Sequence, residues 1–440
     1  MIAETTHLEG LAGRRLALVE SMLHDVFYDG IARARAAGLN LHLLIRDRGW
    51  YGDDRAWVNH PLLRVDALSV VDTHSVAAVV AAITDDDGRP LVDGITTFSD
   101  YHTEIAAAAA ELLGLPSPGI AAVRTANNKP LLRDRLGDQS CNVPYVLVTD
   151  AAQLVDVAAR LGFPIVAKPP AEAISHGVRR VDDEADMKAA YDELSQARTS
   201  LRGQPRPGHV LFEKYVEGPE FSVESLTVAG ETGFYGITAK HVGPPPTFLE
   251  TEHSFPAVLD PATTNVILET VASVLRQLGY RQGPAHTEVR LTPKGPRVVE
   301  VNPRAPAGNL TTMLQDVCGR DLQLDAMLLA VGGHPPLPAG PGPGRGAAVV
   351  MLYPPPDAEV LEHIDGLPEA AAVTGVRTVV FARPGDELWH RIDNGARVGL
   401  LYAQAADPAT ALTRAREAAG RVTVRARHHH PVGTHRGGDA

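Results

Sequence analysis

The chain has 440 residues, of which 44% are hydrophobic and 21% are charged, and its formal net charge is -12. Because one hydrophobic core stops growing at about 250–300 residues, we expect roughly two to four domains. The negative charge argues against sequence-independent binding to nucleic acid or anionic lipid, which depends on clustered lysine and arginine. No apolar stretch approaches the roughly 18 residues of a membrane span, and no signal-like segment opens the chain. Cys141 and Cys318 stand in no metal-like or paired spacing. We therefore expect a cytoplasmic protein with reduced thiols and no membrane or nucleic-acid partner.

Residues 1–125 alternate strands and helices, which is typical of a doubly wound α/β domain. Strands are expected at the short apolar segments Arg15–Val19, Leu41–Ile45, Val79–Ile83 and Gly94–Phe98. Helices are expected at Tyr28–Ala37 and His102–Leu113. No GxGxxG motif follows any of these strands, and no P-loop motif occurs in the chain. We predict that this domain binds a substrate or frames a cleft.

A second region is predicted at 126–335, with a mobile central lobe at about 148–211. It mixes strands such as Ile165–Lys168 and Val210–Tyr215 with helices such as Ala151–Leu161. The Pro/Gly-rich stretch Gly332–Gly346 follows, and because its prolines remove amide donors, a linker is favoured over a phosphate loop. A C-terminal α/β domain is expected at 336–425. Residues 426–440, with His428 to His430, are expected to form a flexible tail rather than a metal site.

The segment from His286 to Asn309 carries the most informative pattern. Two alternating segments flank a turn at Pro293–Pro296, which predicts a β-hairpin. We expect Thr292 to lie opposite Pro296 in this hairpin. A slip of one residue would move every side chain of one strand to the other face.

In the expected register Glu288 faces Glu300, and Asn302 lies two residues further on the same face. Two facing carboxylates repel each other unless a cation lies between them. Mg²⁺ favours a few protein oxygens and takes its other ligands from water and phosphate. The pattern therefore predicts Glu288, Glu300 and Asn302 as metal ligands; an exposed acidic hairpin face is the alternative.

The run VEVNPR, with Glu288 one strand earlier, resembles the metal-binding hairpin of ATP-grasp enzymes. Three upstream segments fit that family in order: the helix start NNKPLLRDRL, the strand FPIVAKPP and the hinge VLFEKYVEGPEFSVE. The resemblance implies an ATP-grasp fold whose nucleotide contacts come from Lys129, Lys168, Ser175, Gly177, Glu213, Lys214, Tyr215, Val216, Glu220 and Lys240. It implies that Lys168 contacts the α and β phosphates. It also implies that the backbone at 213–216 meets the adenine edge, and that Glu220 takes the ribose hydroxyls.

Lysine usage supports the same site without reference to the family. The chain has only six lysines, and Lys129, Lys168, Lys214 and Lys240 fall in or beside the expected nucleotide site. An ammonium and a guanidinium are not interchangeable against phosphates, so a chain that otherwise favours arginine has a reason to keep lysine here. With so few lysines, coincidence is the alternative.

One segment departs from the family pattern. The glycine-rich flap expected after Lys168 reads PPAEAISHGVRRV, with Glu172 and Ala173 in place of glycines. Fewer glycines restrict the backbone, so we expect a stiffer flap, an additional contact from His176 or weaker ATP binding. A surface loop in which His176 has no role is the alternative.

The flanking segments resemble the L-amino acid ligase branch of the superfamily. GITTFSDYHTEIAAAAAELLGLP at Gly94–Pro116 carries this resemblance in the first domain. RGAAVVMLYPPP at Arg345–Pro356 and DNGARVGLLYAQAADPATAL at Asp393–Leu412 resemble the C-terminal domain of that branch.

The resemblance implies an ATP-dependent carboxylate–amine ligase that forms an amide bond through an acyl phosphate and releases ADP and phosphate. ATP and Mg²⁺, with Mn²⁺ as a substitute, are the implied cofactors. Lys168 and Arg304 are the implied catalytic residues, because the charge that spreads during phosphoryl transfer needs fixed cations. Arg304 pairing structurally with one of the metal glutamates is the alternative.

The acceptor pocket is expected near His241, Glu250 and His253, with Gly308 and Asn309 as further substrate residues. Small molecules are the expected partners: an amino acid, an amine or a short peptide. A homodimer is compatible with this interpretation. The alternative functions are a biotin-carboxylase-like or nucleotide-substrate carboxylase, a kinase that releases acyl phosphate, and a non-catalytic nucleotide-binding module.

Overall fold

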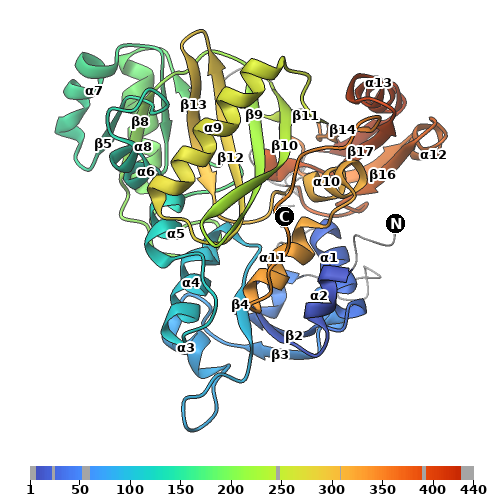
Figure 1. The fold of residues 1–440 in the computed structure, drawn as a ribbon. Coiled ribbons are helices and arrows are strands. Elements are labelled where there is room, and N and C mark those ends of the chain that lie inside the picture. Colours follow the sequence, from blue (N-terminus) through green and yellow to red (C-terminus); the bar gives the residue numbers. More distant parts are fainter. Residues whose placement is uncertain are drawn as a thin grey trace, which may run out of the picture.

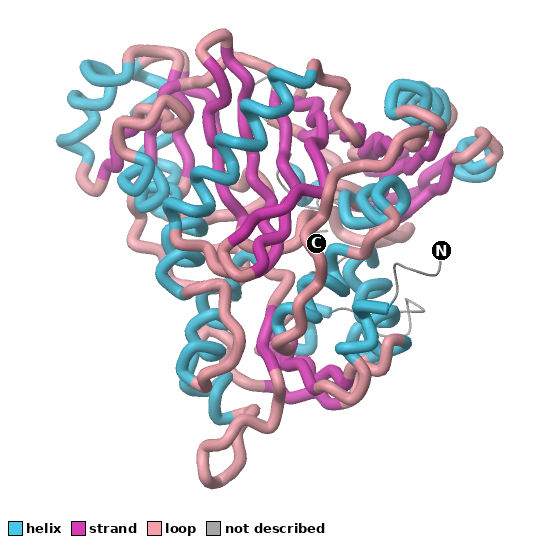
Figure 2. Tube along the Cα trace, viewed as in Figure 1, coloured by secondary structure: helices cyan, strands magenta, loops and turns pink. Residues whose placement is uncertain are grey.

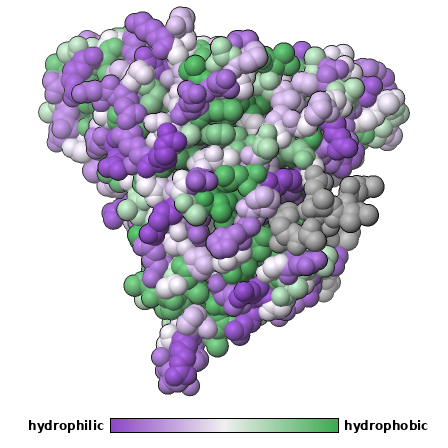
Figure 3. Space-filling model, in the orientation of Figure 1, coloured by the Kyte–Doolittle hydropathy of each residue, from purple (hydrophilic) through white to green (hydrophobic). Residues whose placement is uncertain are grey.

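The structure is a computed structural model that describes residues 6–21, 25–51, 60–243, 248–307, 309–388 and 393–427. Three parts of the chain meet around one large sheet (Figure 1). Helices cover the sheets and lie between the parts (Figure 2). Hydrophilic side chains cover much of the face drawn in Figure 3, including the loop between α3 and β4 that projects at the bottom.

The N-terminal part contains a parallel sheet in the order β3-β2-β1-β4. Its strands are β1 (Arg15–Val19), β2 (Asn40–Ile45), β3 (Ala67–Val70) and β4 (Gly94–Thr96). Its helices are α1 (Asp25–Ala36), α2 (Pro61–Arg64), α3 (Val76–Ala81) and α4 (Thr103–Leu112). The predicted α/β domain is confirmed.

One strand of this domain was predicted at the wrong place. Val79–Ile83 overlaps α3, which begins where the Ser75 hydroxyl accepts a hydrogen bond from the amide of Ala78. A short apolar run fits a buried helix as well as a strand, and here the cap decides between them. The third strand is β3, which lies at the sheet edge and lacks a fully buried residue.

The large sheet has eight strands in the order β13-β12-β9-β10-β11-β14-β17-β16. The strands are β9 (Glu220–Val228), β10 (Glu231–Val242), β11 (Glu250–Phe255), β12 (Gly283–Thr292), β13 (Gly295–Asn302), β14 (Gly346–Leu352), β16 (Val376–Val380) and β17 (Gly399–Ala405). Helices α5 (Ile120–Asn127), α6 (Lys129–Leu136) and α9 (Pro261–Leu278) pack on it with their own buried cluster. Because β11 pairs with β14, the C-terminal region continues this sheet.

The central lobe has a separate sheet in the order β5-β8-β6-β7. It consists of β5 (Tyr145–Val148), β6 (Ile165–Lys168), β7 (Arg179–Val181) and β8 (Val210–Lys214), with α7 (Leu154–Leu161) and α8 (Glu184–Gln196). The C-terminal region adds β15 (Val360–Asp365), β18 (Thr423–Arg427), α12 (Leu367–Ala371) and α13 (Pro408–Ala419). Each of these two parts has its own hydrophobic cluster.

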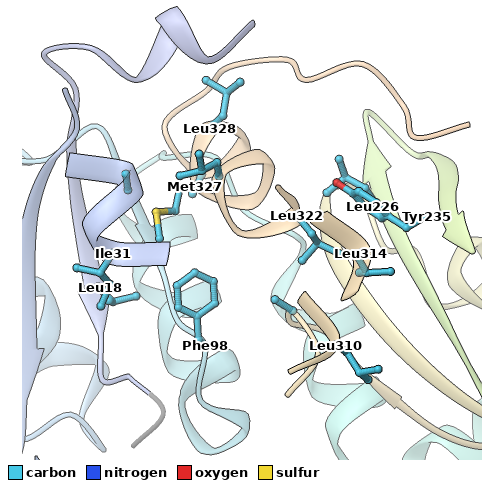
Figure 4. Close-up of a cluster of buried hydrophobic side chains, with 14 of the residues drawn as sticks. Leu18, Ile31, Phe98, Leu226, Tyr235, Leu310, Leu314, Leu322, Met327 and Leu328 are labelled. Carbon is cyan, nitrogen blue, oxygen red and sulfur yellow. The ribbon is translucent and has the colours of Figure 1, made fainter. Parts of the chain in front are cut away.

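The largest core joins the N-terminal domain to the main sheet through α10 (Leu310–Cys318) and α11 (Leu322–Ala330). Figure 4 shows Phe98 of the N-terminal domain on one side and Leu226 and Tyr235 of the sheet on the other. Every residue of α11 is buried, as expected of a helix that is packed on all sides.

Between α11 and β14 the described chain contains no helix and no strand, only an isolated bridge from Ala339 to Phe234. The stretch is irregular, and its role as a linker stays a prediction. Most of the predicted tail, from His428 onward, lies outside the described residues. No described helix has the length and apolar character needed to cross a membrane.

The contact between β4 and α11 yields a stability prediction. A Cβ at Gly94 would lie 1.9 Å from the carbonyl oxygen of Ala330, so Gly94→Ala must push the helix end away from the sheet. Overpacking of this kind costs about 1–3 kcal/mol. We expect G94A to lower the midpoint temperature of thermal unfolding.

The matched control is Gly342→Ala, because a Cβ at Gly342 meets no atom within 4 Å. G342A should change stability by no more than about 0.5 kcal/mol. Equal midpoints for the two variants would show that β4 does not approach α11 this closely.

Candidate active site

The hairpin of β12 and β13 supplies the predicted metal ligands. Next to the turn its pairing is one residue off the predicted register, with Thr292 opposite Gly295. A β-bulge at Val299, which has no partner on β12, takes up the difference. Beyond the bulge Glu288 faces Glu300, as the sequence predicts.

Both carboxylates are held ionised by neighbouring lysines. Lys129 Nζ lies 3.0 Å from Glu300 Oε2, and Lys240 Nζ lies 2.5 Å from Glu288 Oε1. Asn302 Nδ2 donates to Glu300 Oε1 at 3.0 Å, which places the amide beside the acid. Burial alone would raise the pKa of each glutamate, but the adjacent lysine outweighs it and lowers both pKa values.

This donor set fits a hard divalent cation. Within the described ranges, no group of three or more His, Cys, Asp and Glu side chains is gathered around one metal position. Glu288, Glu300 and Asn302 nevertheless supply carboxylate and amide oxygens, which Mg²⁺ and Mn²⁺ accept. Each glutamate also has a lysine ammonium beside it. A bound metal ion can take over the role of that positive charge.

The ligands line one cleft, with an empty volume of about 1280 Å³, that also takes in most of the predicted nucleotide residues. These are Lys129, Lys168, Ser175, Glu213, Lys214, Tyr215, Val216, Glu220 and Lys240. Apolar lining comes from Val143, Val166, Val242 and Phe248, which suits a flat base. The central lobe and the main sheet thus face each other across a single site.

Lys168 is fixed by a buried acid at the centre of this cleft. Its Nζ lies 2.6 Å from Glu213 Oε2, and Arg133 Nε donates to the other oxygen of Glu213 at 2.7 Å. Burial lowers the pKa of Lys168, while Glu213 acts in the opposite direction. Arg133 is fully buried and also donates to the backbone of β13. It therefore ties the central lobe to the β12–β13 hairpin that carries the three predicted metal ligands (the metal hairpin).

Lys240 lies among three acids. Its Nζ is 3.3 Å from Glu220, 2.9 Å from Glu250 and 2.5 Å from Glu288. Burial lowers the pKa of Lys240, but the three carboxylates outweigh burial and raise it well above its usual value. A single ammonium therefore connects the hinge, strand β11 and the metal hairpin.

The hinge is held by Arg290 of β12. Its Nε donates to Glu220 at 3.0 Å, and its Nη1 donates to the carbonyl oxygen of Val216 at 2.9 Å. Tyr215 packs against Phe248, with 6.3 Å between the ring centroids. The predicted adenine and ribose contacts are thus adjacent.

Arg304 lines the cleft, but it pairs with an acid that the sequence did not reveal. Its guanidinium forms two hydrogen bonds to Asp100 of the N-terminal domain, with 2.8 Å between Nη2 and Oδ2. Nη1 donates to the carbonyl oxygen of Ala305 at 2.8 Å. The N-terminal domain thus holds one lining residue of the cleft in place, although none of its described residues lines the cleft itself, and Arg304 pairs with Asp100 rather than with a metal glutamate.

The flap after Lys168 contacts the C-terminal region. Ile174 and Ser175 have φ values of 55° and 59°, a left-handed conformation that side chains rarely adopt. Asn394 Nδ2 donates to Ser175 Oγ at 3.1 Å, and His176 Nδ1 lies 3.0 Å from Asp393 Oδ2. His176 thus has a partner across the flap rather than being a residue without contacts.

The flap is also anchored by Glu172, one of the residues that replace the expected glycines. Its carboxylate accepts hydrogen bonds from the Tyr101 hydroxyl and from Arg206, and its backbone carbonyl accepts from Lys129 at 3.0 Å. Gly177, at φ 74°, provides the turn but does not line the cleft. These bonds agree with the expected stiffer flap.

Of the four predicted substrate residues, one lines the cleft, two lie outside it and one is not described by the structure. His253 lines the cleft, lies 3.2 Å from Glu250 and is 1% exposed. Burial lowers its pKa, which favours the neutral ring, although Glu250 acts in the opposite direction. His241 is exposed and lies outside the cleft, because neighbouring residues of a strand point to opposite faces and Lys240 points inward. Asn309 is buried as the N-cap of α10 and does not line the cleft. Gly308 lies outside the described residues.

Three comparisons with known proteins agree with this geometry. Family models match in chain order: the ATP-grasp N-terminal domain at residues 14–117, the ATP-grasp domain at 161–313 and the L-amino acid ligase C-terminal domain 2 at 351–427. An uncharacterized protein of Sinorhizobium fredii, y4rH, is 30% identical over 78% of this chain and 70% of its own length. Carnosine synthase 1 of Gallus gallus is 30% identical over 59% of this chain, which spans only 29% of that protein.

Among solved structures, the L-amino acid ligase from Bacillus licheniformis superposes with a TM-score of 0.77 at 22% identity, covering 94% of this chain and 99% of that one. At this identity the match establishes the shared fold. The three family models match in the expected order, and together they establish the family. The chain belongs to the ATP-grasp superfamily, in the branch of carbon–nitrogen ligases that carries the L-amino acid ligase C-terminal domain.

Proposed function

We propose that this protein joins a carboxylic acid to an amine through an acyl phosphate and releases ADP and phosphate, with amino acids or a short peptide as substrates. One observation carries the proposal: a single cleft contains four lysines, the facing pair Glu288 and Glu300, and Arg304. The names of the relatives, carnosine synthase and L-amino acid ligase, support this reaction class.

The hinge end of the cleft takes the nucleotide. The valine and phenylalanine lining grips the base, and the backbone at 213–216 meets its polar edge. Glu220 takes the ribose hydroxyls. Lys129 and Lys168 turn from their acids toward the phosphates, because an ammonium binds a phosphate as a compact point charge.

The metal hairpin would hold the cation that neutralises the reacting anions. Glu288, Glu300 and Asn302 would hold Mg²⁺, or Mn²⁺ in its place. When bound, the metal ion supplies the positive charge that lets a carboxylate approach the γ-phosphate. Lys240 then remains with Glu220 and Glu250.

In the first step a carboxylate oxygen of the acid forms a bond to the γ-phosphorus as the bond from that phosphorus to the ADP oxygen breaks. Arg304, whose guanidinium is held in the cleft by Asp100, supplies fixed positive charge near the transferred phosphoryl group. In the second step the amine attacks the acyl carbon, phosphate leaves and the amine loses a proton. The neutral ring of His253 lies in the cleft, where it can accept that proton.

The flap, held by Ser175 and Glu172, excludes water from the acyl phosphate.

The nucleotide site can be tested by binding. Lys168→Gln removes one charged hydrogen bond to the phosphates, and such bonds contribute about 1.5–3 kcal/mol. We expect the Kd for Mg·ATP in titration calorimetry to rise by about 10- to 100-fold. Lys188→Gln is the matched control, because Lys188 lies on α8, outside the cleft, and pairs with Asp192 at the surface. An unchanged Kd for K168Q would remove Lys168 from the nucleotide site.

The reaction can be tested by ADP release from pairs of amino acids and small peptides, with mass spectrometry of the products. We expect amine-dependent ADP release that EDTA abolishes and that Mg²⁺ or Mn²⁺ restores. Glu300→Gln should lower the rate by at least about 100-fold, because a catalytic metal contributes several kcal/mol.

Glu252→Gln is the control for this experiment, because Glu252 pairs with Arg416 outside the cleft and should not affect the rate. ADP release without any amine would indicate a kinase. Incorporation of labelled bicarbonate would indicate a carboxylase, and either result would contradict the proposed ligase.

A further inference from the structure

One arginine of the C-terminal region reaches the cleft with unused hydrogen-bond donors. Three arginines line the cleft: Arg290, Arg304 and Arg397. In the first two, Nε, Nη1 and Nη2 all contact an acceptor. Arg397 uses Nε toward the Tyr353 hydroxyl at 3.0 Å and Nη2 toward Glu250 at 2.7 Å. Its Nη1 has no partner within the part of the chain that the structure describes.

Arg397 is held rigidly although it belongs to another part of the chain. It follows the short 3₁₀ turn Asn394–Ala396 and precedes β17, and its side chain is 14% exposed. The Tyr353 hydroxyl, which accepts from Arg397, donates to the backbone carbonyl of Glu250 at 2.9 Å. Asn394 accepts from the amide of Glu250 at 3.0 Å. The guanidinium is therefore fixed against the start of β11.

The side-chain contacts of Arg397 are to β11 and Tyr353 rather than to the hinge. Its partner Glu250 contacts Lys240, which in turn contacts Glu288 of the metal hairpin. The neighbouring Asn394 contacts the flap at Ser175. Arg397 thus lies where β11 and the segment beside the flap meet. Glu250 and Lys240 connect it to Glu288 of the metal hairpin, and Lys240 also contacts Glu220 of the hinge.

The charges at this end favour a zwitterionic ligand. Glu250 is ionised, because Lys240 and Arg397 outweigh its burial and hold its pKa well below the usual value. A carboxylate that enters beside this acid needs a fixed cation with free donors, and a guanidinium offers two parallel N–H bonds to a carboxylate. An amine on the same molecule would meet Glu250 and the neutral ring of His253.

We propose that Arg397 binds the carboxylate of the amine-donating substrate, so that this substrate is an amino acid or a peptide with a free C-terminal carboxylate. Simple amines are then poor substrates. This inference rests on the proposed ligase function. It makes the C-terminal region a specificity element, because its arginine, rather than any nucleotide-binding residue, distinguishes the acceptor.

The test compares each amino acid that acts as the amine in the ADP-release assay with its amide, for example L-alanine with L-alaninamide. We expect wild-type kcat/KM to favour the acid by about 10- to 100-fold, as for a hydrogen bond to a charged group. Arg397→Gln should abolish this preference by raising the KM for the acid, with the KM for ATP unchanged. Arg397→Lys should keep part of the preference for the acid that Arg397→Gln loses, because lysine retains the positive charge but lacks the paired donors of a guanidinium.

Arg416→Gln is the matched control. Arg416 also connects the C-terminal region to β11, through Glu252, but outside the cleft, so this variant should keep the wild-type preference. Equal losses for acid and amide in R397Q would show that Arg397 only supports Glu250. A wild-type enzyme that uses the amide as well as the acid would also overturn the inference. Absence of turnover with any pair would instead contradict the ligase function itself.

Discussion

The cleft depends on the mutual neutralisation of buried acids and bases. Taking a carboxylate out of water costs several kcal/mol unless a cation lies beside it. Here Lys129 neutralises Glu300, and Lys168 and Arg133 share Glu213. Lys240 lies among Glu220, Glu250 and Glu288, of which Glu220 also pairs with Arg290 and Glu250 with Arg397. Because these side chains come from the central lobe, the hinge and the main sheet, the same ion pairs hold the lobes in register.

This arrangement also explains how one site can be stable when empty and still receive a highly charged ligand. The lysines and acids satisfy each other in the absence of ligands, whereas a nucleotide with its metal ion brings both signs of charge. Lysines can then pass from carboxylate to phosphate, and Glu288 and Glu300 from lysine to metal, without leaving a charge unpaired. The main sheet extends this network into the C-terminal region, because β11 pairs with β14 and carries Glu250 against Arg397.

Local patterns in the sequence revealed the elements of the site but not all of its partners. The hairpin and the facing pair Glu288 and Glu300 were predictable from strand alternation. The bulge at Val299 was not, because an extra residue in a strand leaves no compositional signal in a single sequence. The predicted register was therefore wrong at the turn and right at the acids.

Contacts between distant segments were beyond sequence reasoning. Asp100 meets Arg304 across 204 positions, and Glu250 meets Arg397 across 147. Neither pair has a spacing that helix or strand periodicity can predict. Buried Arg133 lay inside a helix that the family resemblance had singled out for Lys129 alone. Its position within a run of apolar and basic residues gave no sign that it would bridge two parts of the fold.

The central claim is that the facing acids of the β12–β13 hairpin exchange their lysine partners for a metal ion shared with the nucleotide. The most direct measurement is a crystal structure with Mn²⁺ and ADP, in which anomalous scattering locates the manganese. The account predicts manganese bound to Glu288 and Glu300 beside Asn302, with Lys129 turned toward the phosphates. Manganese at another position, with the pairs of Lys129 to Glu300 and Lys240 to Glu288 intact beside bound ADP, would contradict it.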